Sequence, residues 1–403
     1  MGTSRPRVLF VSHSATRNGA TILLLQELAW LRTRVDWDFE ILVRGHGALI
    51  DDFRAIAKTT VWRDLRHTLD TLLRGRLPRL QRLIEDLHAR CTLPGGRYDL
   101  VYCNTSALAR DIPCLARGGT PVLWHIHELA YALKVSVKPE HRMAAVRSTT
   151  RAVAVSAAVR QAIESQLGIP AARVDVVNGF VPLDANTNEA DDERRRRGRA
   201  LLNLEPESFV VGACGTPGWR KGSDLFLQIA ARLRDTTGPV HFLWVGGTAG
   251  SREHIEFAHD MKALGLKDRC HIVPDTGSVS DLYAAMDVFA LTSREDPFPL
   301  VMLEASRHRL PWICFRGAGG ADELVAAGAG IAVPYLDVNS FAECITKMHV
   351  DAAFRARMGH AARARVEREH TADAQCPKLL RAMLACMPAQ HAMHHARPSP
   401  TSQ

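Results

Sequence analysis

The stretch of residues 287–305, DVFALTSREDPFPLVMLEA, holds three elements in the order that decides the fold. It begins with an apolar segment, Val288 to Leu291, which predicts a buried strand, and continues through a loop rich in acids and prolines. A helix is predicted to follow, because Leu300, Val301 and Leu303 occupy its first turns. This order is typical of a parallel α/β sheet, where side chains at the strand's carboxyl end and N–H groups at the helix start face a ligand.

The rest of the chain repeats this alternation of strand and helix. In the first half, strands are predicted at 8–12, 39–43, 100–103, 122–126 and 152–155, separated by helices such as 21–31, 71–89 and 159–167. In the second half, strands are predicted at 209–213, 240–245, 270–273, 288–291, 312–315 and 330–333. Strands that alternate with helices predict a parallel, doubly wound sheet. We therefore expect an α/β protein with two Rossmann-like domains that face each other across a cleft.

Composition suggests the domain boundaries. The first domain is expected at 1–185 and the second at 207–370. Residues 186–206 are polar and charge-dense, and are interpreted as a linker or the start of a solvated helix. A helix at 371–387 has an apolar face and is predicted to pack back across the domains, whereas 388–403 has the composition of a disordered tail.

Two clusters of basic residues have alternative explanations. The run from Arg194 to Arg197 fits a nucleic-acid patch, but a solvated surface is the more frequent explanation of such a run. His391, His394 and His395 fit a metal site, but nothing else in the tail supports a fixed one. We therefore expect neither a metal ion nor a nucleic-acid partner.

Composition and charge bound the class of protein. The chain has 403 residues, of which 46% are hydrophobic, enough for two globular domains. Lys and Arg number 51 against 43 Asp and Glu, and the net charge of +8 suits an anionic partner such as a nucleotide or a phospholipid surface. The nine cysteines are scattered without a C-x-x-C pair, which favours a reducing cytosol. The first apolar run has only five residues, too short for a signal peptide, and no run has the length of a membrane span.

A basic, glycine-containing loop follows the first strand of the second half. It reads GTPGWRKG at 215–222 and precedes a helix predicted to start near Ser223. Lys221 and Arg220 would then lie beside free helix N–H groups, an arrangement that suits a diphosphate. The alternative is a basic loop on a solvated sheet edge.

Two acids in the opening stretch complete the candidate site. Asp296 and Glu304 are eight positions apart, and carboxylates accept hydrogen bonds from the hydroxyls of a ribose or a hexose. Acids favoured by the helix dipole are the alternative explanation. Near the N-terminus, a strand, a polar loop with Gly19 and a helix lack the G-x-G-x-x-G pattern, so a looser phosphate or acceptor loop is expected there.

Six motifs now point to a family. They are NGA (18–20), HIHE (125–128), VVNGF (176–180), GTPGWRKGSD (215–224), SREDPFPLVMLEAS (293–306) and GGADELV (319–325). In this order they resemble the retaining glycosyltransferases of the GT-B fold, family 4, over residues 8–337. The motifs of the second half are the more specific ones.

The resemblance implies roles for individual residues. Lys221 would neutralise the donor diphosphate, Asp296 would contact the transferred sugar, and Glu304 would hold the ribose hydroxyls. His127 would lie under the donor sugar near the reacting carbon, although a lone histidine at a strand end often has a purely structural role. With Lys221 and Asp296 it makes up the expected catalytic set. The remaining donor-binding residues that the resemblance implies are Gly19, Arg220, Glu295 and the backbone N–H groups of Phe298, Leu300 and Val301.

Three departures from the family pattern concern the donor. Thr216 stands where the family usually has an arginine, and Arg220 is the candidate substitute. Asp296 stands where the family usually has a glutamate followed by Gly-Phe-Gly, and Pro299 lacks the N–H of the second glycine. Glu295, beside Asp296, remains an alternative for the sugar contact.

The function implied is a metal-independent, retaining hexosyl transfer from a nucleotide diphosphate sugar to an acceptor hydroxyl, with no cofactor. The first domain would bind the acceptor and the second the donor, in the synthesis of cell-surface polysaccharide, glycolipid or glycoconjugate. The alternative is a non-catalytic nucleotide-sugar-binding subunit with the same fold.

Membrane contact is a separate expectation. The predicted helix at 71–89 carries Arg74, Arg76, Arg79 and Arg82 beside leucines, which fits either contact with anionic lipid or a solvated amphipathic helix. We therefore expect a cytoplasmic protein, with a peripheral position at the inner face of the membrane and a lipid-linked acceptor as the finer hypothesis.

Overall fold

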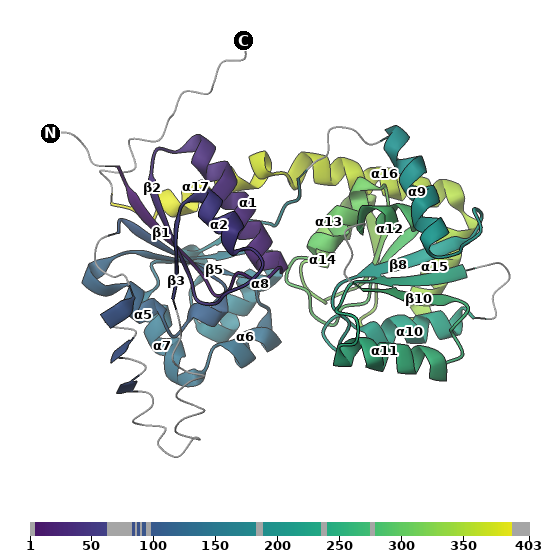
Figure 1. Cartoon of the computed structure of the whole chain (residues 1–403), viewed down its shortest axis with the longest axis horizontal. Helices are drawn as coiled ribbons and strands as arrows, with labels where there is room; N and C mark the ends of the chain where they lie inside the picture. Colours follow the sequence, from purple (N-terminus) through teal and green to yellow (C-terminus); the bar gives the residue numbers. More distant parts are fainter. Residues whose placement is uncertain are drawn as a thin grey trace, which may run out of the picture. The chain divides into compact units, whose positions relative to one another are not determined.

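The chain folds into two compact units, which are described separately. The computed structural model describes residues 5–62, 83–84, 87–88, 91–93, 98–182, 188–234, 240–274 and 279–388. Unit 1 contains Met1–Gly179 and Ala372–Gln403, and unit 2 contains Phe180–Thr371 (Figure 1). Each unit is built on one parallel sheet.

The sheet of unit 1 has seven parallel strands in the order β3-β2-β1-β4-β5-β6-β7. Its strands are β1 (Arg7–Ser12), β2 (Asp38–Val43), β3 (Lys58–Val61), β4 (Leu100–Asn104), β5 (Val122–Ile126), β6 (Arg151–Ala154) and β7 (Val174–Val176). Its helices are α1 (Gly19–Arg34), α2 (Ile50–Ile56), α5 (Ile112–Leu115), α6 (Ala130–Ser136), α7 (Pro139–Ser148), α8 (Ala157–Ala162) and α17 (Ala372–Leu384). The winding direction reverses between β1 and β4, so the loops that follow these strands diverge there.

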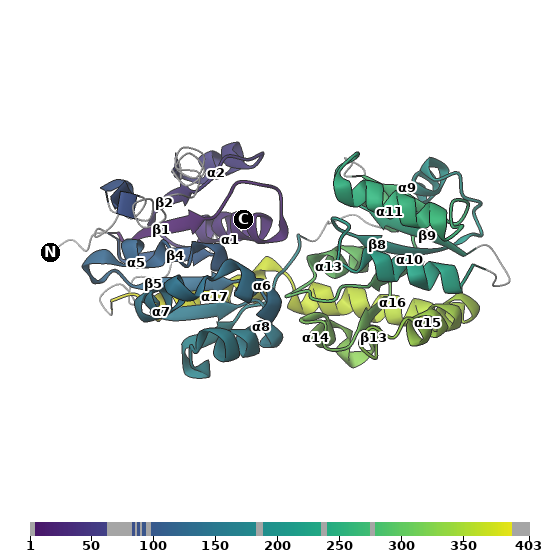
Figure 2. The same cartoon turned by 90° about the horizontal axis from the view of Figure 1, so that it is seen from below.

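Helices cover both faces of this sheet. α1, α2 and α17 bury leucines and Phe53 on the face that carries Phe10 and Tyr102 (Figure 1). Seen from below, α5, α6 and α7 lie in front of the strands, on the opposite face (Figure 2). α17 follows the last helix of unit 2 in sequence but belongs to unit 1, where Leu379 and Met383 are fully buried. Each such side chain contributes about 1.5–3 kcal/mol to folding.

The sheet of unit 2 has six parallel strands in the order β10-β9-β8-β11-β12-β13. Its strands are β8 (Phe209–Cys214), β9 (Val240–Val245), β10 (Cys270–Val273), β11 (Val288–Leu291), β12 (Trp312–Phe315) and β13 (Gly330–Val333). Its helices are α9 (Asn188–Leu201), α10 (Ser223–Arg232), α11 (Arg252–Ala263), α12 (Val279–Ala285), α13 (Leu300–Arg307), α14 (Ala321–Val325), α15 (Val338–Val350) and α16 (Ala352–Glu369). Here the winding direction reverses between β8 and β11.

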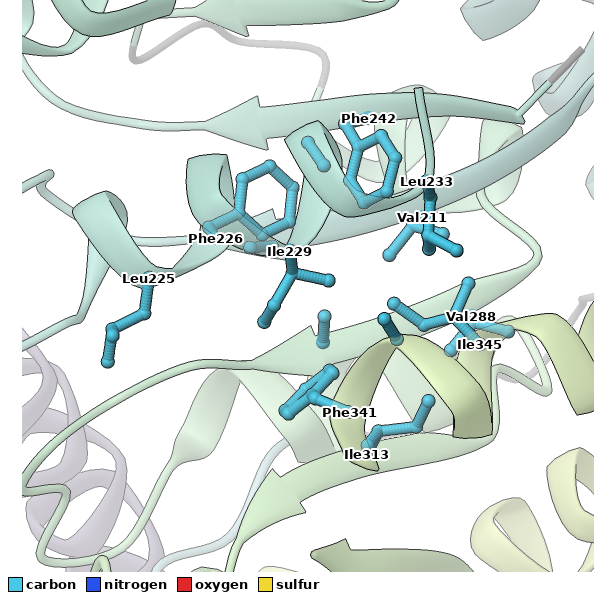
Figure 3. Close-up of a cluster of buried hydrophobic side chains, with 14 of the residues drawn as sticks. Val211, Leu225, Phe226, Ile229, Leu233, Phe242, Val288, Ile313, Phe341 and Ile345 are labelled. Atoms are coloured by element: carbon cyan, nitrogen blue, oxygen red, sulfur yellow. The ribbon is translucent and has the colours of Figure 1, made fainter. Parts of the chain in front are cut away.

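One continuous apolar core lies under α10 and α15. Phe226 of α10 packs against Phe242 of β9, with ring centroids 5.5 Å apart, and Phe341 of α15 packs against Phe315 of β12, with centroids 5.2 Å apart. Figure 3 shows Phe226, Phe242 and Phe341 among the side chains of this core. On the opposite face of this sheet lie α9, α12 and α13 (Figure 1). The α/β architecture with two doubly wound parallel sheets is therefore confirmed, and each predicted strand is present within one residue of its predicted ends.

Two edge strands were not predicted. β3 (KTTV) and β7 (VDV) are short, and their side chains are at best partly buried apart from Val174. A strand at the edge of a sheet buries little apolar surface, so its sequence lacks the apolar run by which the inner strands are recognised.

Of the two interpretations of residues 186–206, the linker is wrong, because residues 188–201 form helix α9 within unit 2. Asp287, at the start of β11, accepts hydrogen bonds from Arg195 (2.7 Å) and from the buried Arg199 (2.9 Å). Arg195 also donates to the carbonyl oxygens of Ala284 and Met286. Within the arginine run, only the strongly exposed Arg196 fits a solvated surface well, since Arg195 is part of the packing.

Two other expectations fall outside the described residues. The predicted helix at 71–89 is described only at 83–84 and 87–88, and the tail beyond residue 388 is not described. Among the helices of the described ranges, none combines the length and the apolar character that crossing a bilayer requires.

Candidate functional site

The candidate donor-binding residues of unit 2 lie on the loops that follow β8 and β11. These strands are neighbours at the point where the winding direction reverses. In open α/β sheets such a point leaves a crevice outside the carboxyl ends of the strands, where ligands bind. The loop 215–222 follows β8 and the loop 292–299 follows β11.

The two loops approach each other so closely that a glycine is required. Gly222 caps the N-terminus of α10 with a φ of 68°, and a Cβ atom there would lie 2.0 Å from the carbonyl oxygen of Thr292. The Thr292 hydroxyl donates to the carbonyl oxygen of Lys221 (3.1 Å). Arg294 adds a bidentate ion pair with Asp224 of α10, with N–O distances of 2.8 and 2.7 Å. The loop after β8 is thereby tied to the loop after β11 on both sides of Lys221.

Lys221 and Asp296 form a largely buried ion pair. The Nζ atom of Lys221 lies 2.7 Å from Oδ2 of Asp296, and Asp296 is only 4% exposed. The backbone holds this carboxylate in place, because the Asp296 N–H donates to Ala318 and its carbonyl oxygen accepts from Gly320. The structure thus brings together the cation and the acid to which the sequence assigned the diphosphate and the sugar.

Glu304 lies on α13 with its carboxylate turned into the protein. The Tyr283 hydroxyl, on α12, donates to it at 2.8 Å. Burial raises the pKa of Glu304, while the hydrogen bond from Tyr283 and the charge of Lys221 act in the opposite direction. Tyr283 was not identified from the sequence, because nothing in a helix sequence marks which tyrosine faces an acid 21 residues away.

The other candidates of unit 2 surround the ion pair. Arg220 is exposed, and its guanidinium donates to the carbonyl oxygen of Glu295 (3.0 Å), so it lies beside the acids. Leu300 and Val301 are the first residues of α13, and their N–H groups have no acceptor within that helix. Pro299 is the N-cap residue of α13, so the N–H group that it lacks would lie at the cap position and not within the first turn of the helix. Phe298 is buried and packs against His370, with ring centroids 5.4 Å apart.

In unit 1, His127 lies just beyond β5 and is held by two interactions. Its Nε2 atom is 2.7 Å from Oδ1 of Asn104, the last residue of β4. Its backbone N–H donates to Glu128, which also accepts from the N–H of Ser106. Burial raises the pKa of Glu128 to about 7, against the effect of these two hydrogen bonds.

A buried polar chain lies directly under His127. The Tyr102 hydroxyl bonds both Glu27 of α1 (2.9 Å) and Nδ1 of His125, and the rings of His125 and His127 are 4.2 Å apart. Burial raises the pKa of Glu27 to about 8, although the hydrogen bond from Tyr102 opposes it. Burial also holds the pKa of His125 well below its usual range. His125 is therefore neutral. His127, just beyond β5, is the last residue of this buried polar chain.

Gly19 is the first residue of α1 and is exposed, directly after the N-cap Asn18. It and His127 belong to unit 1, whereas the other candidate residues belong to unit 2. Asn104, Tyr283 and Arg294 are polar contacts of the candidate residues that sequence reasoning missed, since each is defined by a partner distant in the chain. Among the described residues, no group of three or more His, Cys, Asp or Glu side chains is placed to hold a metal ion.

Two doubly wound α/β units, each with a crevice outside the carboxyl ends of its strands, are the architecture of GT-B glycosyltransferases. Comparison with known proteins agrees. A family model described as glycosyltransferase family 4 matches residues 18–185, and one described as glycosyl transferases group 1 matches residues 206–351. The chain belongs to this family of glycosyltransferases, the fold of which is confirmed.

Several known proteins are similar to this chain in sequence or in structure. A D-inositol 3-phosphate glycosyltransferase of Gordonia bronchialis is 29% identical over 74% of this chain and 69% of its own. The lipopolysaccharide core mannosyltransferase LpsB of Rhizobium meliloti is 27% identical over 42% of this chain and 48% of its own. The structure of Anabaena HepE in complex with UDP and glucose has a TM-score of 0.74 at 22% identity, covering 94% of this chain and all of HepE. WaaG, a glycosyltransferase of lipopolysaccharide biosynthesis, has a TM-score of 0.69 at 16% identity, covering 93% and 98%.

Proposed function

We propose that this glycosyltransferase moves a hexosyl group from a nucleoside diphosphate sugar to an acceptor hydroxyl, with retention of configuration and without a metal ion or other cofactor. The observation that carries the proposal is the Lys221–Asp296 pair of 2.7 Å at the switch point between β8 and β11. Lys221 would take the charge of the departing diphosphate, a task that a metal ion performs in other enzymes. Asp296 and Glu304 would accept hydrogen bonds from the sugar and the ribose.

Arg220 is the second cation of the proposed donor site. Its guanidinium is anchored on the carbonyl oxygen of Glu295, next to the acid that pairs with Lys221. It thus stands near enough to replace the arginine that is missing at Thr216. Glu295, Phe298, Leu300, Val301 and Gly19 complete the proposed donor contacts, the three helix-start residues through their backbone N–H groups.

The first nucleotide to test is UDP, because the similar HepE structures contain UDP and glucose. A thermal-shift screen of UDP, GDP, ADP and their sugars should show one base that raises the melting temperature, since a ligand that binds only the folded state stabilises it. The donor so found is then incubated with the protein, and proton NMR of the anomeric signal reports whether the product keeps the donor's configuration.

Three outcomes contradict the proposal. Inversion of the anomeric signal would refute retention. Stabilisation by the nucleotide sugar without hydrolysis or transfer to any hydroxyl would favour the alternative, a non-catalytic nucleotide-sugar-binding subunit. Activity that disappears with EDTA and returns with a divalent cation would refute metal independence.

We further propose that the acceptor is lipid-linked and that the protein works in the cytoplasm, at the inner face of the membrane, in the synthesis of cell-surface glycans. Support comes from α6 and α7, which directly follow His127 and expose Tyr131 (53%), Val135 (67%) and Met143 (59%). The same two helices and the two residues between them expose the cations Lys134, Lys138, Arg142 and Arg147. Exposed apolar side chains among cations suit the interface of an anionic bilayer. All nine cysteines are free thiols, which fits a reducing compartment.

Sedimentation with vesicles tests this location. Vesicles that contain phosphatidylglycerol should carry the protein down at low salt, and neutral phosphatidylcholine vesicles should do so less. Val135→Ser should reduce the bound fraction, whereas Val350→Ser, a matched control at an 81% exposed valine of unit 2, should not. Equal reduction by both variants, or no binding to anionic vesicles, would remove the membrane proposal and leave the sugar transfer untouched.

A further inference from the structure

Three residues from separate elements of unit 1 form one hydrogen-bonded chain. Asn104, at the end of β4, is fully buried. Its Nδ2 atom donates to the carbonyl oxygen of Ala20 in the first turn of α1 (3.0 Å), and its Oδ1 atom is 2.7 Å from Nε2 of His127. β1, which leads into α1, and β4 are neighbours at the switch point of this sheet, and β5 is the next strand, so the sheet order brings the three residues together.

The chemistry of the partners settles where the protons lie in this chain. A backbone carbonyl oxygen only accepts, so the atom of Asn104 that faces Ala20 must be the NH₂ group. The amide oxygen of Asn104 then faces His127, and because an amide oxygen also only accepts, Nε2 of His127 must carry a proton.

His127 has no second ring proton. Burial, together with the smaller effect of the neighbouring His13, lowers the pKa of His127 to about 3. The imidazole is therefore neutral at physiological pH, and Nδ1 holds a lone pair. The backbone N–H of His127 donates to the carboxylate of Glu128 (2.9 Å), which also restrains the residue that carries the half-buried ring.

We propose that Asn104 is a positioning residue, which keeps His127 as the Nε2–H tautomer so that Nδ1 serves as an acceptor for a sugar hydroxyl. A hydroxyl donates its proton to Nδ1 of this tautomer, whereas the other tautomer would present an N–H at the same place and leave the Asn104 oxygen facing a lone pair. The role in sugar binding rests on the proposed function together with the family resemblance, which implies that His127 lies under the donor sugar. The tautomer itself depends only on the contacts of unit 1.

Asn104 also links His127 to the loop that precedes α1. Asn104 is bonded to Ala20, which follows the N-cap Asn18 and Gly19 of the NGA motif. A displacement of the α1 N-terminus would therefore loosen the amide and with it the ring of His127. The motifs NGA and HIHE, more than 100 residues apart in sequence, thus both contribute to the position of the His127 ring.

Nitrogen-15 NMR of the full-length protein, labelled at histidine and with His127 assigned by its loss in His127→Gln, tests the proposal directly. The wild type should show a protonated Nε2 and an unprotonated Nδ1 at His127 between about pH 5 and 8. Asn104→Ala should give a mixture of both tautomers, and Asn104→Asp, which keeps an acceptor oxygen, should restore the Nε2–H form while raising the pKa of His127. Asn178→Ala is the matched control, because Asn178 also donates to a backbone carbonyl of unit 1, that of Val155 (3.0 Å).

A protonated Nδ1 in the wild type would overturn the proposal without any variant, so the test survives if Asn104→Ala fails to fold. An unchanged tautomer in folded Asn104→Ala would overturn it as well. For the donor found in the thermal-shift screen, Asn104→Ala should lower kcat about 10–100-fold and Asn104→Asp should recover part of it at high pH. If the spectra behave as expected and kcat does not change, the tautomer assignment stands and the donor-site role of His127 fails.

Discussion

The ion pair between Lys221 and Asp296 gives the sharpest prediction about the site. Replacing Lys221 by alanine leaves the carboxylate of Asp296 buried at 4% exposure, with the Ser293 hydroxyl at 3.4 Å as its remaining side-chain partner within the described residues. Removing one partner of a buried pair costs about 3–5 kcal/mol, because the other charge stays desolvated. At about 2–4 °C per kcal/mol for a unit of this size, Lys221→Ala should melt about 6–20 °C lower than the wild type.

Nucleotide binding separates the role of the lysine from that of the acid. Lys221→Ala removes a charge-assisted bond to the diphosphate worth about 1.5–3 kcal/mol, so the Kd for the nucleotide should rise about 10–150-fold. Asp296→Asn frees Lys221 from its partner, so the same Kd should stay equal or fall, while turnover of the nucleotide sugar falls. In the proposed site the diphosphate would compete with Asp296 for the ammonium group of Lys221, and the asparagine would remove this competition.

Calorimetric titration and thermal unfolding of the same samples provide the assay. Lys262→Ala, at an exposed lysine of α11, is the control and should change neither quantity. The double variant Lys221→Ala with Asp296→Asn should recover most of the lost melting temperature, because no buried charge remains unpaired. If Asp296→Asn weakens nucleotide binding as much as Lys221→Ala does, the assignment of Lys221 to the diphosphate and Asp296 to the sugar is refuted.

Three further predictions concern the surrounding structure. In the wild type the free energy of unfolding should fall between about pH 4.5 and 8, because the Glu27 carboxyl keeps its proton up to about pH 8 in the folded state but loses it near 4.5 in the unfolded state. Glu27→Gln should flatten this fall. Identical pH profiles of the two proteins in urea unfolding would contradict this. Glu304→Gln should weaken nucleotide binding about tenfold, measured by calorimetric titration. The same variant should not lower the free energy of unfolding at pH 8, because the raised pKa of Glu304 shows that its buried carboxylate destabilises the folded state as the pH rises. Arg195→Ala should cost about 2–4 kcal/mol in urea unfolding and the neighbouring Arg196→Ala less than about 0.5 kcal/mol, since Arg195 bonds Asp287 and two carbonyl groups whereas Arg196 pairs with the exposed Glu193. Similar values for both variants would contradict a packing role of Arg195.

The inner strands were predictable because they bury both faces. Segments such as Val288–Leu291 and Trp312–Phe315 are continuous apolar runs of the length of a strand, and the helices between them bury one side. The edge strands β3 and β7 lack such runs, so local sequence carries little signal for them. Helix α9 was obscured by its charges, since the residues that hold it are partnered by Asp287, some 90 residues further along the chain.

The candidate donor residues were found in the sequence through motifs, and the contacts around them were not. Lys221 and Asp296 lie in recognisable stretches, but their separation of 2.7 Å depends on β8 and β11 being neighbours in the sheet. Asn104 gave no signal at all, because an asparagine at a strand end has many uses until its neighbours are known. Tyr283 is the same case on α12.

The sequence by itself determined the alternation of strands and helices, hence the two doubly wound sheets, and it marked the lysine, the acids and the histidine of the candidate site. Those features depend on local patterns of apolar and polar residues, which act over a few positions. Only the tertiary structure decided which of two adjacent acids pairs with Lys221, that the arginines of α9 bind Asp287, and that Asn104 faces His127. These are contacts between residues 23 to 92 positions apart, and they follow from the order of strands in each sheet, which no local pattern encodes.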